Sequence, residues 1–364
     1  MKVLHILDHV NRGGLEILAL DLCRNAKANN LDLVFITLGK GQLFEDFKES
    51  GADFFYFQRK APIDFKVVLK LRKVIRENGI NIIHAHQDVT IVHSILASAG
   101  LKIKVVQTIH GFNDKRSPVG KNLTVAHLIM KSASYFLPIS FAVSQYLQQE
   151  LMSTGYSKSK LKVLNNGIDF SRIHPFDNSN VPKDGNIFFG MLGNFNMARN
   201  HKLLLYAFSK LANEYPRSRL KLAGTGDLFN ESKEYAAKLG ISEKVEFLGS
   251  ISNVSKFFSS IDYYVHSSRA DTFGIAVVEA MYSGLPVIVS DNGPFVEITD
   301  NGKLANLFIA NNVESLYQKL KEATMDNNYS NQEDSNYIRD RVVKKFSIES
   351  HIHHLKCFYK ELLG

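Results

Sequence analysis

The sequence contains little cysteine and no long apolar run, and both absences narrow the kinds of protein it encodes. Only Cys23 and Cys357 occur among its 364 residues, both in stretches that the local pattern predicts as helices. We therefore expect neither a disulfide framework nor a cysteine-ligated metal site. No segment reaches the roughly 18 consecutive apolar residues of a membrane-spanning helix. The first eight residues resemble a strand rather than a signal peptide, so we expect a cytoplasmic protein.

Two common phosphate-binding motifs are also missing. No G-x-G-x-x-G follows a predicted strand, and G-x-x-x-x-G-K-[ST] occurs nowhere in the chain. Glycines at that spacing let the backbone approach a pyrophosphate or cradle a nucleotide's phosphates. The sequence therefore lacks the motif that would indicate a dehydrogenase or a P-loop NTPase.

What is present is an alternation of short β-rich runs with amphipathic segments, which predicts parallel sheets covered by helices on both faces. A polar stretch after residue 169 interrupts it and is interpreted as a linker. We expect an α/β fold of two doubly wound, Rossmann-like domains, 1–170 and 171–346, facing each other across a cleft. The expected strands are 3–7, 33–38, 54–57, 82–85, 105–109 and 135–139, then 187–190, 220–223, 245–248, 263–266 and 286–289.

The net charge of +8 is concentrated in the first half. Two explanations stay open: a surface that binds an anionic membrane or a phosphorylated acceptor, and a merely solvated lysine-rich surface. Nucleic acid is a weaker third option, because no helix-turn-helix, zinc or stacking signature accompanies the charge. The basic residues are Arg59, Lys60, Lys66, Lys70, Arg72, Lys73, Arg76, Lys102, Lys104, Lys115, Arg116, Lys121, Lys131, Lys158, Lys160 and Lys162.

Two strand-to-helix loops are candidates for anion binding. Gly13 and Gly14 follow the first strand and precede a helix, where glycine lets the backbone approach an anion. The alternative is a tight turn without a ligand. Arg199 lies in the loop that opens the second half, where its guanidinium neutralises a diphosphate without a divalent cation. A solvated surface arginine is the alternative there.

The densest candidate segment is Ser267–Met281, where a predicted strand ends and a helix starts near Gly274. The first amides of that helix are unpaired within it and suit a diphosphate. Asp271 precedes the helix and Glu279 lies inside it among apolar neighbours, which offers one carboxylate to a sugar and the other to a diol such as ribose. A capping aspartate and a surface glutamate are the alternatives.

This segment resembles the E-x7-E region of the retaining nucleotide-sugar glycosyltransferases of family 4 (group 1), which have the GT-B fold of two Rossmann-like domains. Other stretches are similar to that family's motifs in the same order along nearly the whole chain. The C-terminal helix 347–364 also resembles the family's, which packs back on the first domain. The similar stretches are Arg12–Gly14, Asn166–Asp169, Gly193–Asn200, Leu222–Gly226 and Gly284–Ile288.

The resemblance implies roles for individual residues. His110, at the end of a predicted strand, would contact the transferred sugar as a catalytic residue together with Asp271, unless local backbone satisfies its ring. We expect such backbone bonding for His84 and His86. Glu279 would bind the ribose. The diphosphate would be held by Arg199, Asn194, Gly13, Gly14 and the amides of Phe273, Gly274 and Ile275.

Two positions depart from the family's pattern. Asn194 stands where the family usually has an arginine and Arg199 where it has a lysine, so one positive charge is missing. Asp271 replaces the first glutamate and is one methylene shorter. Both changes keep open a protein that binds a nucleotide sugar with a decayed catalytic site.

The resulting hypothesis is transfer of a sugar from a nucleotide diphosphate, UDP by default, with retention of anomeric configuration. No D-x-D occurs, which agrees with protein donors in place of a metal, so we expect no metal or other cofactor. The expected acceptor is a glycan or lipid-linked molecule of bacterial surface polysaccharide synthesis, reached at the inner face of the membrane. An epimerase or hydrolase of the same fold is the competing enzyme class.

Overall fold

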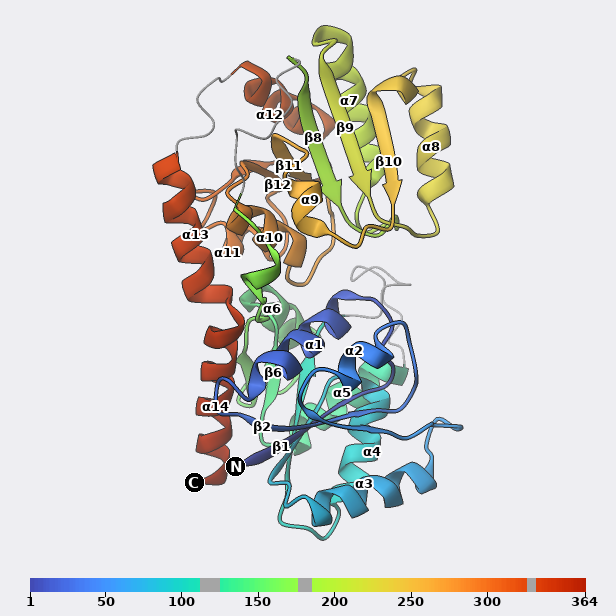
Figure 1. Cartoon of the computed structure of the whole chain (residues 1–364), viewed down its shortest axis with the longest axis vertical. Helices are drawn as coiled ribbons and strands as arrows, with labels where there is room; N and C mark the ends of the chain where they lie inside the picture. The colour runs from blue at the N-terminus through green and yellow to red at the C-terminus, as the bar shows by residue number, and fades with distance from the viewer. Residues whose placement is uncertain (112–124, 176–184, 326–331) are drawn as a thin grey trace. The chain divides into compact units, whose positions relative to one another are not determined.

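The computed structural model describes residues 1–111, 125–175, 185–325 and 332–364, and the chain forms two compact units (Figure 1). The first unit comprises Met1–Asp169 with Phe346–Gly364, and the second comprises Phe170–Lys345. The division at Asp169 lies next to the expected boundary after residue 170. Most of the expected linker, and three basic residues named above, lie outside the described residues: Lys115, Arg116 and Lys121.

The first unit is a seven-stranded parallel sheet in the order β3-β2-β1-β4-β5-β6-β7. Its strands are β1 (Lys2–Leu7), β2 (Asp32–Thr37), β3 (Asp53–Tyr56), β4 (Ile82–Ala85), β5 (Lys104–Ile109), β6 (Ser140–Ala142) and β7 (Leu161–Val163). Its helices are α1 (Gly14–Ala26), α2 (Phe44–Lys48), α3 (Phe65–Glu77), α4 (Asp88–Ser98), α5 (Val125–Phe136), α6 (Gln145–Ser153) and α14 (Ile348–Leu363).

The second unit is a six-stranded parallel sheet in the order β10-β9-β8-β11-β12-β13. Its strands are β8 (Ile187–Leu192), β9 (Ser218–Ala223), β10 (Val245–Gly249), β11 (Tyr263–His266), β12 (Val287–Ser290) and β13 (Asn306–Phe308). Its helices are η1 (Phe170–Arg172), α7 (His201–Glu214), α8 (Phe229–Lys238), η3 (Ser242–Lys244), α9 (Val254–Phe258), α10 (Ile275–Ser283), α11 (Phe295–Ile298), α12 (Val313–Met325) and α13 (Gln332–Phe346), whose last residue belongs to the first unit.

Both sheets are doubly wound, so the expected α/β fold class is confirmed. The strand order reverses between β1 and β4 in the first unit and between β8 and β11 in the second. In such sheets the crevice beyond the carboxyl ends of the strands at the reversal is the usual ligand position. Each unit therefore carries its own candidate position for polar groups, at the ends of these strands.

The strand pleat decides which side chains of the first unit face which helices. Val3 and Leu7 join the core that contains α1 and α14, whereas Leu4 and Ile6 join the core that contains α3 and α4. Side chains of a strand alternate between faces, so His5 lies on the α14 side. The helix α14 buries residues at spacings of four, three and four, which places them on one face. These residues are Ile348, Ile352, Leu355 and Tyr359.

One expected strand is wrong. Residues 135–139 do not form a strand, because α5 continues to Phe136 and β6 begins only at Ser140. Ala133 and Leu137 are buried against the core on the α3 and α4 side. The residue before a proline disfavours the helical region, which explains why the helix stops ahead of Pro138. The strands β7 and β13, of three residues each, were not expected.

Candidate active site

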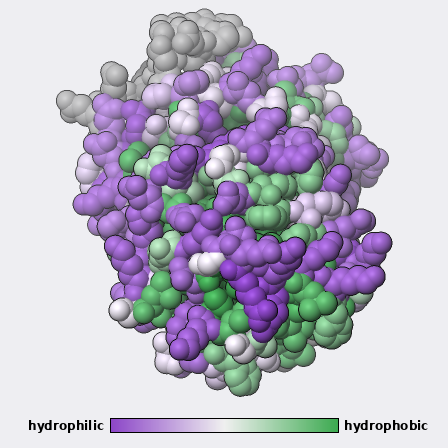
Figure 2. All heavy atoms as spheres, turned by 60° about the horizontal axis from the view of Figure 1, so that its bottom comes forward, coloured by the Kyte–Doolittle hydropathy of each residue, from purple (hydrophilic) through white to green (hydrophobic). Residues whose placement is uncertain are grey.

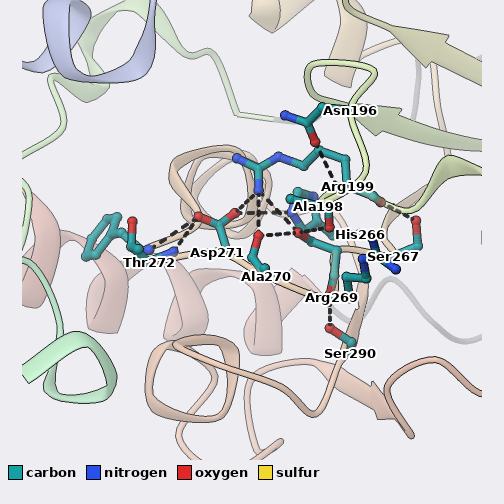
Figure 3. Close-up of polar contacts among 12 residues, drawn as sticks. Asn196, Ala198, Arg199, His266, Ser267, Arg269, Ala270, Asp271, Thr272 and Ser290 are labelled. Carbon is teal, nitrogen blue, oxygen red and sulfur yellow. Dashed lines mark hydrogen bonds and ion pairs between the residues drawn. The ribbon is translucent and has the colours of Figure 1, made fainter. Parts of the chain in front are cut away.

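The carboxylate of Asp271, in the loop between β11 and α10 of the second unit, is surrounded by polar groups of Arg199, His266 and Thr272 (Figure 3). Arg199 approaches from the loop before α7, and its Nη1 lies 2.8 Å from Asp271 Oδ2. Nε2 of His266, the last residue of β11, lies 3.5 Å from the same oxygen. The second carboxylate oxygen accepts hydrogen bonds from the amides of Thr272 at 2.8 Å and Phe273 at 3.4 Å.

The guanidinium of Arg199 is fixed by its surroundings. Its Nη1 also donates to Ser268 Oγ and to the Ala270 carbonyl, each at 3.2 Å. The hydroxyl of Ser268 lies 3.0 Å from the carbonyls of Ala198 and Ala270 and ties the two loops together. In the described residues, all hydrogen bonds and the ion pair of the Arg199 guanidinium involve Nη1. The aliphatic part of Arg199 packs over Gly193, and a Cβ on that glycine would lie 3.5 Å from Arg199 Cδ.

The Arg199–Asp271 pair lies in a mostly buried position, with 25% and 9% of the two side chains exposed. Burial alone would raise the pKa of the Asp271 carboxyl, but Arg199 and His266 together hold it well below its usual range. Burial lowers the pKa of His266, and Asp271 opposes that shift only in part. Asp271 is therefore an anion and His266 a neutral ring at physiological pH.

The amino terminus of α10 is shaped by Gly274. Its φ of +88° lies in the left-handed region, and a Cβ there would lie 2.7 Å from the Phe295 ring, so glycine is required on both grounds. The helix has no side-chain cap from its N-cap residue Gly274. Of the three expected amides, that of Phe273 is bonded to Asp271, and those of Gly274 and Ile275 stand at the positive end of the helix dipole.

The loop after β8 packs closely against a second glycine-rich loop, which follows β9. A Cβ on Gly224, whose φ is +135°, would lie 2.1 Å from the carbonyl oxygen of Gly193. The end of β9 can therefore pack directly on the loop before Arg199. Asn194 lies in this loop with an exposed side chain, so the substitution of the family's arginine leaves a solvent-facing amide.

Glu279 is buried on α10, and its partner comes from a residue that the sequence did not suggest. Arg172 Nη2, in η1, lies 2.8 Å from Glu279 Oε1. Only 6% of the glutamate side chain is exposed. A buried carboxylate held by a partly exposed guanidinium is oriented rather than loose, as a group that recognises a diol needs to be.

In the first unit, Gly13 is the N-cap of α1 and Gly14 its first residue. A Cβ on Gly13 would lie 2.5 Å from Oε2 of Glu16, which folds back over it and is buried. His9 Nδ1 lies 3.4 Å from the other carboxylate oxygen. Burial raises the pKa of Glu16. The chain's own carboxyl group therefore occupies the space beside Gly13, and the glycine is explained within the unit.

His110 lies just beyond β5, and its Nε2 is 3.0 Å from Nδ1 of His86. His86 in turn contacts His5, and His84 contacts Tyr359 and Thr108. The expectation that local backbone satisfies His84 and His86 is therefore wrong. Their rings point to the face where α14 packs, and side chains of neighbouring strands and of α14 are their partners.

The structure thus brings Arg199, Asp271 and the amino terminus of α10 together in the second unit. His110, Gly13 and Gly14 belong to the first unit. The residues missed by sequence reasoning are Arg172, His266, Ser268 and the partners of His110. No local motif marks them, because each reaches its partner only through the strand order or through the approach of another loop.

The described residues contain neither a metal-binding cluster nor a membrane-spanning helix. No group of three or more histidine, cysteine, aspartate or glutamate side chains in those residues is arranged to hold a metal ion. Among the same residues, no helix combines the length and apolarity that a bilayer crossing requires.

The two halves of the chain match two family models. Residues 12–172 match the model described as Glycosyltransferase Family 4. Residues 174–340 match the model described as Glycosyl transferases group 1. The two matches meet near Arg172, close to the division between the two units.

Individual proteins agree with these matches. EpsF of Bacillus subtilis (strain 168), named as a glycosyltransferase, is 27% identical over 311 residues, which cover 80% of this chain and 79% of EpsF. A UDP-Gal:alpha-D-GlcNAc-diphosphoundecaprenol alpha-1,3-galactosyltransferase of Escherichia coli is 24% identical over 318 residues, 82% of this chain and 80% of that protein. Among solved structures, Anabaena HepE in complex with UDP and glucose has a TM-score of 0.84 at 19% identity and covers 99% of both chains.

Proposed function

Since the chain belongs to the glycosyltransferases and has their two-domain GT-B fold, we propose that it transfers a sugar from a UDP-sugar to a lipid-linked glycan acceptor. The observation that carries the donor half of this proposal is the cluster of Arg199, Asp271 and the amino terminus of α10. The complexes of HepE with UDP support UDP as the nucleotide. The acceptor named for the Escherichia coli relative, a diphosphoundecaprenol-linked sugar, supports the acceptor class and a place in bacterial surface polysaccharide synthesis.

In this proposal the diphosphate lies at the start of α10. The amides of Gly274 and Ile275 and the dipole of the helix offer positive charge there, and Arg199 lies beside them. Asp271 already neutralises part of that charge. The donor therefore competes with Asp271 for the guanidinium. Glu279, held by Arg172, recognises the ribose.

The chemistry is proposed to be metal-independent transfer with retention. The bond between the anomeric carbon and the diphosphate oxygen breaks, and the electron pair leaves with the nucleoside diphosphate. Arg199 and the α10 amides stabilise the charge that develops on that oxygen. The acceptor hydroxyl attacks the face that the diphosphate leaves, and its proton departs with the nucleoside diphosphate. His110 and Asp271 contact the transferred sugar.

Binding calorimetry with a panel of nucleoside diphosphates and UDP-sugars tests the donor assignment. We expect UDP to bind and Glu279→Gln to weaken it about tenfold, because one charge-assisted hydrogen bond to the ribose is lost. Glu246→Gln, which neutralises an exposed carboxylate on β10, is the matched control and should leave UDP affinity unchanged.

Three further measurements test the metal requirement, the stereochemistry and the class of reaction. Unchanged turnover after chelation of divalent cations supports the metal-free mechanism, and strict dependence on Mn²⁺ overturns it. The anomeric coupling constant of the product by NMR reports retention or inversion. Consumption of the donor without any acceptor would identify a hydrolase, and binding without turnover would identify a decayed site.

The acceptor class predicts contact with a membrane, and α3 offers a surface for it. Val67, Val68, Leu71, Val74 and Ile75 bury one face of this helix. Its other face exposes Phe65 and Leu69, and Ile63 is exposed just before the helix. Exposed basic residues interleave with them: Lys66, Lys70, Lys73 and Arg76. Figure 2 brings this end of the first unit forward and shows green apolar residues between purple hydrophilic ones.

Such a mixture of apolar and basic side chains suits an anionic bilayer, into which the apolar groups insert while the lysines face lipid phosphates. Flotation with vesicles of phosphatidylglycerol and phosphatidylethanolamine tests it. We expect binding that drops about tenfold in Phe65→Ser/Leu69→Ser. Ile309→Ser, an exposed apolar residue of the second unit, is the control. Failure of the native protein to float with anionic vesicles removes the membrane part of the proposal.

A further inference from the structure

The ring of His266 lies beside the Arg199–Asp271 pair, and one of its nitrogens makes no hydrogen bond in the described residues. His266 ends β11 and is 2% exposed. Its Nδ1 lies 3.1 Å from the Tyr264 hydroxyl, which lies 3.2 Å from the carbonyl oxygen of Leu192. Its Nε2, the nitrogen without a hydrogen bond, lies 3.5 Å from Oδ2 of Asp271 (Figure 3). We call Leu192, Tyr264, His266 and Asp271 the His266 line.

The second sheet explains why these groups meet. Tyr264 and His266 are two residues apart on β11, so their side chains share one face of the sheet. Leu192 ends β8, which is the neighbour of β11, and Asp271 lies in the loop that follows β11. The His266 line therefore lies where the strand order reverses.

Only one form of the His266 ring satisfies every contact of the line. The Tyr264 hydroxyl has one proton to donate, and burial raises its pKa, so it keeps that proton. When it donates to Leu192, it accepts from Nδ1–H of His266, and a neutral ring then faces the carboxylate with a bare Nε2. When the neutral ring carries its proton on Nε2, the hydroxyl donates to Nδ1 and the Leu192 carbonyl loses this donor. The doubly protonated ring donates to both Tyr264 and Asp271, and Tyr264 donates to Leu192.

In the free protein the surroundings keep the His266 ring neutral. Burial lowers its pKa, Asp271 raises it and Arg199 lowers it. Arg199 and His266 approach the same oxygen of Asp271, at 2.8 and 3.5 Å. The guanidinium already balances that carboxylate, so a second cation would leave the buried cluster with excess positive charge.

The other described elements packed against the ring leave this balance unchanged. Burial lowers the pKa of His201, at the start of α7, to about 3, and it raises that of Tyr264, so both groups are neutral. Glu279 of α10 is a carboxylate, and it is paired with Arg172. The strand β12 and the helix α11 present apolar groups to the ring: Val289 and Phe295. The protonation of His266 is therefore decided by the ion pair.

Binding of the donor changes this balance. A nucleoside diphosphate brings several negative charges to the start of α10, beside Arg199. The guanidinium then faces the diphosphate as well as Asp271, and the cluster as a whole becomes negative. Such an excess favours the charged form of a group that takes up a proton. His266 is suited to this role, because each of its nitrogens then has an acceptor, the Tyr264 hydroxyl for Nδ1–H and Asp271 for Nε2–H.

We propose that His266 is a positioning residue of the donor site, and that it takes up a proton when a nucleoside diphosphate binds and holds Asp271 while Arg199 turns to the diphosphate. Since the diphosphate is proposed to lie beside Arg199, this role rests on the proposed function. The proton comes from the solvent and returns to it when the nucleotide leaves. The complex then binds more protons than the free protein, so donor affinity falls as the pH rises. We expect a fall of about fivefold from pH 6.5 to 7.5, within the tenfold limit for one proton.

Calorimetry of UDP binding in two buffers of different ionisation enthalpy measures the proton uptake. The difference between the two binding enthalpies, divided by the difference in ionisation enthalpy, is the number of protons taken from the buffer. At pH 7 the terminal phosphate of UDP has largely lost its last proton, because its pKa is about 6. We expect the native protein to take up more than about half a proton per UDP. No uptake, or a release of protons, overturns the proposal.

His266→Gln and His201→Leu form a matched pair of variants. Glutamine keeps a hydrogen-bonding side chain but does not titrate, so UDP should bind without proton uptake and with a flat pH profile. His201→Leu removes a second buried histidine of the same unit, which stacks on Phe195 at 3.9 Å, and it should keep the uptake. Uptake that persists in His266→Gln, or that is lost in His201→Leu alone, assigns the proton to another group and overturns the proposal.

A second measurement keeps the native His266 and covers the case in which His266→Gln folds poorly. Long-range proton–nitrogen NMR of histidine-labelled protein distinguishes a neutral ring from one with both nitrogens protonated. At pH 7, addition of UDP should convert one ring from the neutral to the doubly protonated form. A spectrum in which UDP binds and every neutral ring stays neutral overturns the proposal.

The role of His266 and the proposed function fail in different ways. If UDP does not bind the native protein, the donor assignment is wrong, and the role of His266 is wrong with it. If UDP binds, Arg199→Ala weakens it and no proton is taken up, the donor site is supported and only the role of His266 is wrong.

Discussion

The cluster around His110 in the first unit consists of neutral rings joined by hydrogen bonds, whereas the cluster around Asp271 in the second is built on an ion pair of a guanidinium and a carboxylate. His5, His84, His86 and His110 lie between β1, β4, β5 and α14 and are linked by hydrogen bonds, in part through the Tyr359 hydroxyl. The Arg199–Asp271 pair sits at a loop and a helix terminus. Neutral donors and acceptors suit hydroxyl groups, and fixed charges suit phosphate. This difference is in line with the proposal that the second unit binds the diphosphate and that His110 of the first contacts a sugar hydroxyl.

The largest expected effect is that lowering the pH reduces the folding stability of the first unit more than that of the second. Below a pH of about 6.5 the unfolded chain's histidines bind protons that the folded rings refuse, so folding stability falls as the pH drops. The loss is up to about 1.4 kcal/mol per pH unit for each group until its folded pKa is reached. Among the described residues, six such rings lie in the first unit, and two, His201 and His266, in the second. The six are His5, His84, His86, His110, His127 and His351.

Asp271 destabilises the fold in the same sense as the pH falls, but in a lower pH range. Its folded pKa is depressed, so its contribution is present above the unfolded value near 3.8 and is lost only at still lower pH. Hydrogen exchange read by mass spectrometry between pH 7.5 and 5, corrected for intrinsic rates, should show the first unit losing protection first. Equal loss in both units would contradict the account.

Removal of the charge partner in the second unit should have the next largest effect. Arg199→Ala leaves the mostly buried Asp271 without its ion pair, and we expect unfolding to become easier by about 3 kcal/mol. UDP affinity should fall at least tenfold. Denaturant unfolding and calorimetry measure both, with Arg269→Ala, an exposed arginine of the loop that carries Asp271, as control. A stable variant that still binds UDP would show that Arg199 is only a surface residue.

Neutralising the carboxylate tests whether Asp271 competes with the donor. Asp271→Asn removes the charge that occupies Arg199, so UDP should bind about fivefold more tightly, the value of a modest charge interaction. Transfer should nevertheless slow, because the proposed sugar contact changes. Calorimetry and initial rates give the two numbers. Weaker UDP binding would mean that Asp271 positions Arg199 rather than competes for it.

The smallest expected effect comes from restoring the charge that the family's pattern has at residue 194. Asn194→Arg adds a cation to the loop before α7, and we expect UDP affinity to rise about threefold at low salt and less at high salt. Met197→Arg adds the same charge three residues away and serves as the control. Equal gains in both variants would point to overall charge rather than to a specific contact.

The fold was largely predictable because the strand pattern is clear in both halves. The helix-to-strand boundary at 135–139 failed because Tyr135, Phe136 and Ile139 are typical of strands, while the buried positions Ala133 and Leu137 follow helical spacing. Three-residue strands such as β7 and β13 carry too few residues for a periodic signal.

The candidate site was predictable only where one segment carries it. Asp271, Gly274 and the backbone amides at the start of α10 lie within a few residues of one another in the sequence. Glu279 pairs with Arg172 and His110 with His86, which lie elsewhere in the chain, and the contact of the two histidines follows from the order of the strands. A sequence shows such residues as isolated polar positions in apolar runs, and the pairing becomes visible only with the topology.

We propose above all that the second unit binds the nucleotide diphosphate at the loop before α7 and the start of α10. Hydrogen exchange with and without UDP tests it most directly. The account predicts protection concentrated in residues 193–200 and 271–279, and its loss in Arg199→Ala. Protection by UDP that spares both segments, or that persists in Arg199→Ala, would contradict the assignment of the donor site.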